Sequence, residues 1–152
     1  MSDEEPETVN QITSDMKAAM KEGRKEEVST LRMLISSLNN AKIDKGGELS
    51  DDDVIEVLST EAKQRRESIE AYREGGRDEL VDKEQKELEV VNRYLPEQLS
   101  DDEIAEIVDE AIAETGAETK SDMGRVMGKV MPEVKGQAEG SKVRDIVMEK
   151  LA

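Results

Sequence analysis

Glycines and basic residues alternate over residues 120–144 in a pattern that could bind a phosphate backbone. The residues concerned are Gly124, Arg125, Gly128, Lys129, Lys135, Gly136, Gly140 and Lys142. A glycine inside a helix costs up to about 1 kcal/mol relative to alanine, so helix propensity alone does not favour this spacing. Glycines let a ligand approach the backbone closely, while lysine and arginine neutralise phosphates. The segment therefore predicts a surface that binds the sugar-phosphate chain of RNA.

The alternative explanation of the same glycines is structural. On a helix, Gly124 and Gly128 lie at the edge of an apolar stripe centred between Met123 and Val130, where small residues also let two helices pack closely. Further along, Gly136 and Gly140 would then be turn residues. The sequence leaves both interpretations open.

Most residue types used for acid-base, nucleophilic or metal chemistry are missing or isolated. The chain contains no His and no Cys, which excludes the commonest general base, a thiolate nucleophile, disulfides and Cys-bearing zinc sites. Ser36, Ser37 and Ser59 have no base beside them in the sequence. The acidic runs 51–53 and 101–103 each follow a serine, where carboxylates favour the start of a helix over a metal site. We expect no catalytic residue, metal or cofactor.

The charge of the chain is strongly negative and unevenly distributed. The formal net charge is −16, and residues 99–119 carry eight acidic and no basic side chains, whereas residues 120–152 carry seven basic and five acidic ones. An acidic protein repels nucleic acid and anionic membranes except where basic residues gather, as they do in the last segment. No apolar run approaches the roughly 20 residues that span a bilayer. The N-terminus, MSDEEPE, is acidic where a presequence is basic, so we expect a cytoplasmic protein without a membrane partner.

Apolar residues recur every three or four positions along most of the chain, which predicts seven helices and no strand. Glycines and Pro96 mark the expected helix ends. Serine or threonine residues mark expected starts, at Ser50, at Ser100 with a capping box to Glu103, at Thr119 or Ser121, and at Ser141. The second helix, closed by Gly46 and Gly47, should be roughly 20 residues long.

These elements predict an all-α protein with two domains. Residues 1–95 form an N-terminal helical bundle of about four helices, with residues 1–7 as a disordered acidic tail, and residues 96–152 form a small three-helix domain. Because Phe and Trp are absent, the cores must be aliphatic. Tyr72 and Tyr94 lie on apolar stripes and are expected to pack in the core and not to stack on bases.

Three blocks of the sequence resemble the YqeY family: YLPEQLS at 94–100, DMGRVMGKVMPEVKG at 122–136, and the run Gly140–Val143. In the first half, residues 33–44 and 58–88 follow the family pattern as well, so that only the acidic tail lies outside the resemblance. Three positions depart from the family's usual residues. Arg125 replaces a usual Lys, Glu139 an Asp and Arg144 an Asn, and none of these changes removes the proposed surface.

The resemblance implies a helical fold shared with the C-terminal tail of the B subunit of the tRNA-dependent amidotransferase, which holds tRNA at its elbow. A similar module supports tRNA binding in some bacterial glutaminyl-tRNA synthetases. The resemblance also implies that Gly124, Gly128, Lys129, Lys135, Gly136 and Gly140 face the RNA. Because amidotransferase chemistry belongs to other subunits and another domain, a carbon-nitrogen ligase label with glutamine as amido donor would only be inherited.

Two functions follow from the residues and the resemblance together. The first is a non-catalytic tRNA-binding accessory protein that contacts the tRNA elbow. The alternative is a protein-interaction module that binds an aminoacyl-tRNA synthetase, an amidotransferase or another partner without RNA contact.

Overall fold

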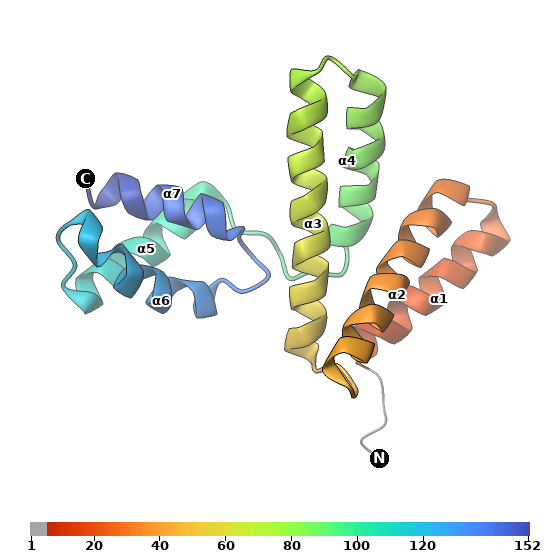
Figure 1. Ribbon diagram of the computed structural model, residues 1–152, viewed down its shortest axis with the longest axis horizontal. Coiled ribbons are helices and arrows are strands. Elements are labelled where there is room, and N and C mark those ends of the chain that lie inside the picture. Colours follow the sequence, from red (N-terminus) through yellow and green to blue (C-terminus); the bar gives the residue numbers. More distant parts are fainter. Residues whose placement is uncertain (1–5) are drawn as a thin grey trace. The chain divides into compact units, whose positions relative to one another are not determined.

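The computed structural model describes residues 6–152, and its contacts fall into two compact units, one ending at Leu95 and the other starting at Pro96. The secondary structure of residues 6–152 consists of seven α-helices and one short 3-10 helix, with no strand (Figure 1), which confirms the all-α prediction. Of the expected acidic tail, residues 1–5 lie outside the described residues, and Glu7 is the first residue of a helix. No helix among the described residues is long and apolar enough to cross a bilayer.

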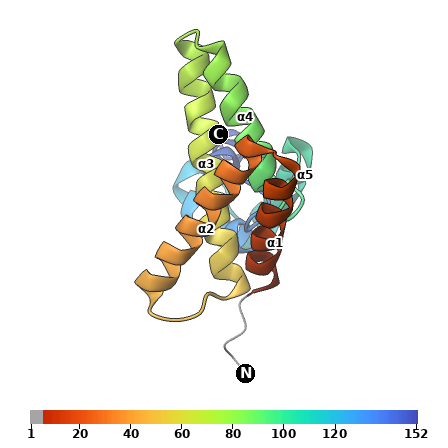
Figure 2. The ribbon, with the colours of Figure 1, turned by 90° about the vertical axis from the view of Figure 1, so that its right-hand side faces the viewer.

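The first unit consists of two helical hairpins. Helices α1 (Glu7–Glu22) and α2 (Lys25–Lys45) pack along each other, as do α3 (Asp51–Glu74) and α4 (Asp78–Asn92), and α2 contacts both helices of the second hairpin (Figures 1 and 2). The predicted glycine stops are present: Gly23 and Gly46 cap α1 and α2 in the left-handed conformation, with φ of 74° and 79°. The second helix is 21 residues long, close to the expected length.

Capping boxes begin α3 and α5 (Asp101–Thr115), as the sequence predicts. The hydroxyl of Ser50 accepts from the N–H of Asp53 at 3.1 Å, and the Asp53 carboxylate accepts from the N–H of Ser50 at 2.9 Å. Ser100 and Glu103 repeat this exchange at 3.2 and 2.9 Å. The acidic runs 51–53 and 101–103 therefore lie in first helical turns, where carboxylates favour the positive end of the helix dipole.

An aliphatic cluster fills the first unit, with fully buried side chains that include Ile12, Leu31, Leu34, Leu58 and Val91. Tyr94 packs against this cluster as expected, and its hydroxyl donates to Asp15 Oδ2 at 2.5 Å. Burial, followed by the contact with Asp15, raises the pKa of Tyr94 above its usual range.

The second unit consists of α5, the 3-10 helix η1 (Lys120–Asp122), α6 (Met123–Glu133) and α7 (Gly140–Lys150), and each α-helix contacts the other two. Its core is again aliphatic, built on Ile104, Val108, Val126, Val130, Val134, Val143 and Val147. The last helix begins at Gly140, one residue before the expected Ser141, and no side chain caps it. The capping serine predicted there is therefore wrong.

Candidate nucleic-acid interface

Two of the predicted site residues, Gly124 and Gly128, lie on the exposed side of α6. Val126 and Val130, on the opposite side of the helix, are fully buried. A Cβ atom built on either glycine would meet no heavy atom within 4 Å. No neighbouring helix of this unit uses the space that the glycines leave, so the close-packing alternative is wrong for Gly124 and Gly128 within the unit.

Of the other two glycines, Gly136 is a turn residue, as the structural alternative predicts, whereas Gly140 is not. Gly136 lies in the turn after α6 with φ of 77°, a conformation that favours glycine. Gly140 is the first residue of α7, where a Cβ would lie 3.7 Å from Cε of Met131, an ordinary contact. Gly124 and Gly128 are therefore open on α6, Gly136 lies in the α6–α7 turn, and Gly140 begins α7.

The α6–α7 turn is held against the segment that precedes α5. The side chain of Gln98 donates to the carbonyl of Gly136 at 2.7 Å, and the N–H of Leu99 donates to the carbonyl of Gln137 at 2.8 Å. Gln137 returns a side-chain hydrogen bond to the carbonyl of Glu97 at 3.2 Å. These bonds position the turn that carries Lys135. Neither Gln98 nor Gln137 was predicted as a site residue, although both lie within or beside the blocks that resemble the family.

Arg125 connects α6 to the end of α5. Its Nη1 donates to the carbonyl of Thr115 at 3.0 Å and its Nη2 to Oδ1 of Asp122 at 2.9 Å. The other oxygen of Asp122 accepts from the N–H groups of Glu118 and Thr119 at 2.9 and 3.2 Å. The Glu118 N–H first, then Arg125 and the Thr119 N–H, lower the pKa of Asp122 to about 2. The guanidinium has five N–H groups, so Arg125 keeps donors for a ligand.

Carboxylates of α5 hold the lysines of α6 and α7. Lys129 lies 2.7 Å from Glu114, a hydrogen bond that raises the lysine pKa, and Lys142 lies 3.0 Å from Asp101. Both lysine side chains are about half exposed, at 51% and 54%. Lys135 is exposed and forms no ion pair with any described residue. The sequence did not predict that Glu114 and Asp101 contact these lysines, because the contacts depend on how the helices pack.

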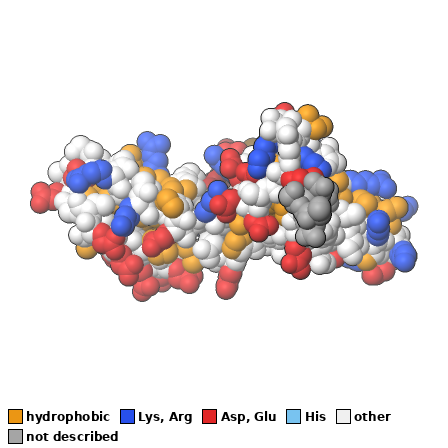
Figure 3. Space-filling model, turned by 90° about the horizontal axis from the view of Figure 1, so that it is seen from below, with side chains coloured by type: hydrophobic (Ala, Val, Ile, Leu, Met, Phe, Trp, Pro, Cys, Tyr) orange, Lys and Arg blue, Asp and Glu red, His pale blue; other side chains and the backbone are white. Residues whose placement is uncertain are grey.

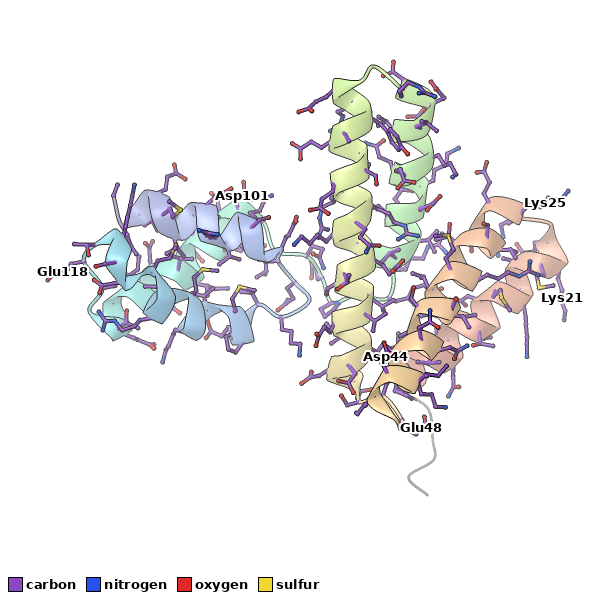
Figure 4. All side chains as sticks on the ribbon, viewed as in Figure 1. Lys21, Lys25, Asp44, Glu48, Asp101 and Glu118 are labelled. Atoms are coloured by element: carbon purple, nitrogen blue, oxygen red, sulfur yellow. The ribbon has the colours of Figure 1, made fainter. Side chains whose placement is uncertain are left out.

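The predicted cations do not form one tight cluster. Asp101 and Glu114 lie at opposite ends of α5, about 20 Å apart at 1.5 Å per helical residue. Figure 4 labels Asp101 at one end of α5 and Glu118 beyond the other. Lys142 therefore lies toward one end of the unit, and Arg125 and Lys129 toward the other. A single phosphate cannot contact both groups, so the surface suits an extended ligand that carries several phosphates.

Acidic side chains are concentrated on one edge of the second unit. In Figure 3 many acidic side chains of the unit, at left, gather along one edge. Four of its basic side chains nevertheless pair with carboxylates: Arg125 with Asp122, Lys129 with Glu114, Lys142 with Asp101 and Lys150 with Asp109. The acidic edge follows from the order of the sequence, because α5 belongs to a run of eight acidic residues and α6 and α7 to a segment with seven basic ones. The acidic edge repels a polyanion, so only the basic part of the unit suits phosphate binding.

Ser37, one of the serines considered as a nucleophile, contacts a carboxylate that is already engaged. The Ser37 hydroxyl donates to Glu61 at 3.1 Å, but the other Glu61 oxygen accepts from the buried Arg65 at 2.8 Å. The carboxylate therefore serves a buried ion pair. Residues 6–152 also contain no group of three or more acidic side chains placed to hold a metal ion.

Fold and site together define an all-helical protein with an open, glycine-containing helix flanked by cations. The family of Yqey-like proteins matches this sequence over residues 9–151, and the chain belongs to that family. The match confirms the resemblance seen in the sequence.

Three fungal relatives illustrate how far the similarity reaches. "Uncharacterized protein C22F3.15" of Schizosaccharomyces pombe is 32% identical over 82 residues, which cover 54% of this chain and 67% of the relative. "Altered inheritance of mitochondria protein 41, mitochondrial" of Clavispora lusitaniae is 34% identical over 101 residues, or 64% of this chain and 58% of the relative. The Eremothecium gossypii protein of the same name is 33% identical over 85 residues, or 55% and 46%. The chain thus spans about half the length of the relatives named for mitochondrial inheritance.

Proposed function

We propose that the second unit binds the sugar-phosphate backbone of tRNA through α6 and the turn that follows it, and that the chain is a non-catalytic accessory protein. The observation that carries this proposal is the open surface over Gly124 and Gly128. Each glycine weakens the helix relative to alanine, and no contact within the unit compensates for that cost. Close approach of a ligand backbone to α6 would account for both residues.

The cations around the two glycines suit phosphate contacts. Lys135 forms no ion pair with any described residue, and Lys129 is half exposed. Exposed ion pairs contribute little to stability, so a phosphate can replace a carboxylate partner at small cost. The acidic α5 opposes RNA binding through long-range repulsion, and we therefore expect weak, salt-dependent affinity.

The kind of RNA in this proposal comes from the resemblance noted in the sequence. The resemblance of the sequence to the amidotransferase tail favours the tRNA elbow as the contact. The printed names of the fungal relatives mention neither RNA nor a ligase, and two of them describe mitochondrial proteins. For this chain a cytoplasmic location remains a proposal, which cell fractionation with an antibody to the protein tests directly.

Fluorescence anisotropy of labelled tRNA across a salt series tests RNA binding. The double variant Lys129→Ala, Lys135→Ala should bind more weakly, with a log-log salt slope reduced by about two because two phosphate contacts are lost. The matched control removes two lysines of α4, Lys83→Ala and Lys86→Ala, and should bind like the wild type. Circular dichroism checks that all three proteins are folded.

Two results would contradict the proposal. The first is an unchanged tRNA anisotropy at low salt with the folded wild-type protein. The second is an equal loss of affinity in the α4 control, which would mean that overall charge and not the α6 surface governs binding. The first result would favour the protein-interaction alternative, in which the chain binds a synthetase, an amidotransferase or another protein. The second would remove the assignment of RNA binding to α6.

A further inference from the structure

A groove on the first unit is lined by large apolar side chains that are exposed to solvent. It lies between α1 and α2, has a volume of about 580 Å³, and is lined on its apolar side by Ala19, Met20, Val28 and Met33. Met20 is 51% exposed and Met33 47%, and only one other large hydrophobic side chain of the described residues, Ile43, is exposed. Two exposed methionines in one groove suggest an adaptable contact surface, because methionine packs against partners of varied shape.

The charged residues of the groove are all positive. Lys25 and Arg32 line it, no acidic side chain does, and neither cation forms an ion pair with a described residue. Figure 4 labels Lys21 and Lys25 on either side of the α1–α2 turn, and Figure 3 shows basic side chains gathered at this end of the hairpin, at right. On a chain with a net charge of −16, this is a local reversal of sign.

Two of the acidic residues beside the groove, Glu22 and Glu27, already have partners, and Glu26 lines the cavity on the α4 side of α2 and not the groove. Arg24 contacts Glu22 at 3.2 Å and Glu27 at 2.5 Å, and Glu27 also contacts Arg93 at 3.1 Å. These guanidinium contacts lower the pKa of Glu27 and keep its charge engaged on the α4 side of α2. The positive charge of Lys25 and Arg32 is therefore available to a ligand.

We propose that the α1–α2 groove binds an amphipathic helix of a partner protein that carries acidic residues beside its apolar stripe. The lining residues of α2 recur from Lys25 to Ser36 at intervals of three and four, along about 17 Å, or three helical turns. A helix of similar length can place its apolar stripe on Met20 and Met33 and its carboxylates against Lys25 and Arg32. RNA would leave the methionines without an apolar contact.

The most acidic helix of a second copy of this chain does not offer such a surface. That helix, α5, turns Ile104 and Val108 into the core of its own unit, where both are fully buried. The site belongs to the first unit and does not depend on the proposed RNA binding. A partner protein with a free acidic helix is therefore the occupant that the charges and the methionines favour.

Methyl NMR of the full-length protein, labelled at its methionines, tests this binding. The probes are a panel of designed helical peptides of about 18 residues with a leucine stripe flanked by glutamates, and their counterparts with lysines in place of the glutamates. At near-physiological salt the acidic peptides should shift the Met20 and Met33 methyl signals saturably, despite the negative charge of the protein. Arg32→Glu should weaken this binding at least about tenfold, because attraction becomes repulsion.

Arg73→Glu is the matched control, since Arg73 is exposed in the last turn of α3 and does not line the groove. It should bind the acidic peptides like the wild type, and Met20→Gln provides a second variant that should weaken binding. The proposal is overturned if no acidic peptide shifts these two methyls more than its lysine counterpart, or if Arg32→Glu and Arg73→Glu behave alike. Dimerisation by ultracentrifugation that Arg32→Glu abolishes, or tRNA that selectively shifts Met20 and Met33, would assign the groove to another occupant and also overturn it.

Discussion

The ammonium of Lys129 lies 2.7 Å from Oε2 of Glu114, so a cation proposed to bind RNA is held by the most acidic helix of its own unit. Both side chains are more than half exposed, at 51% and 57%. An exposed pair of this kind breaks readily, and RNA must compete with Glu114 for the lysine. The carboxylate therefore weakens RNA binding both as a competitor and as a negative charge.

Replacing Glu114 with glutamine tests this competition. Glu114→Gln should raise the affinity for tRNA several-fold and change thermal stability little, because the pair is exposed. The matched control is Glu110→Gln, one turn earlier on α5, which removes the same charge without freeing Lys129. Anisotropy titrations of labelled tRNA measure both variants. An equal gain in both would show that net charge, and not release of Lys129, determines the affinity.

Alanine at the two open glycines separates a binding role from a packing role. The double variant Gly124→Ala, Gly128→Ala should stabilise the protein by up to about 1 kcal/mol per site, because both positions are helical and a Cβ meets nothing within 4 Å. The same variant should bind tRNA more weakly, since added methyl groups keep the RNA from the helix backbone. Urea unfolding and anisotropy measure the two effects.

Gly116→Ala is the control for that experiment. Gly116 also has open space around it, but its φ of 69° strains an alanine, so this variant should lose stability. Destabilisation by alanine at Gly124 and Gly128 would mean that these glycines do serve packing. Higher stability with unchanged tRNA affinity would instead remove the reason to place RNA on α6.

Local signals in the sequence were enough to predict the helices. The Ser50 and Ser100 caps, and the glycine stops at Gly23 and Gly46, depend on groups within a few residues of each other. The start of the last helix was misplaced, because Ser141 suggested a cap, whereas the helix begins at Gly140 without a side-chain cap. A serine near a helix start does not always cap it, because the buried side chains of Val143 and Val147 can determine where this helix lies.

The partners of the site residues could not be read from the sequence. Lys129 and Glu114 are 15 positions apart, and their contact depends on how α5 packs on α6. The same holds for the hydrogen bond of Gln98 to Gly136, which joins segments 38 positions apart. Residue types and spacing identified the cations, but only the packed unit shows which of them already have anionic partners.

The pKa of Asp122 tests the hydrogen bonds that this carboxylate accepts between α5 and α6. Its folded-state pKa of about 2 lies below the ordinary aspartate value of about 3.9. A depressed pKa means that this group stabilises the fold fully above about pH 4, and that its contribution is lost as the pH falls toward about 2. Carboxyl NMR should find this value and show that Arg125→Ala raises it, because one donor to the carboxylate is gone.

Asp53 is the internal control for the same titration. Its pKa is also about 2, but Lys45 and the Ser50 cap hold it down, and all three residues belong to the first unit. Arg125→Ala should leave the Asp53 titration unchanged. If both aspartates shifted together, the variant would have altered the protein as a whole and not one hydrogen bond.

The last prediction concerns Arg65, a buried cation that holds α3 to α4. Only 5% of its side chain is exposed, and it donates to Glu61 at 2.8 Å and to Glu87 at 3.2 Å. Removing one member of a buried ionic group leaves the others without compensation, so Arg65→Ala should cost about 3–5 kcal/mol in the free energy of unfolding. Arg73→Ala, at an exposed position, should change it little, and urea unfolding measures both.

Removal of Arg65 should leave Glu61 and Glu87 with different amounts of uncompensated charge. Glu87 keeps a second cation, since Lys83 lies 3.7 Å away, whereas Glu61 retains the Ser37 hydroxyl at 3.1 Å. The uncompensated charge therefore falls mainly on Glu61, and the double variant Arg65→Met, Glu61→Gln should recover part of the stability that Arg65→Met loses. If Glu87→Gln recovered more than Glu61→Gln, the cost would instead lie at the α4 side of the pair.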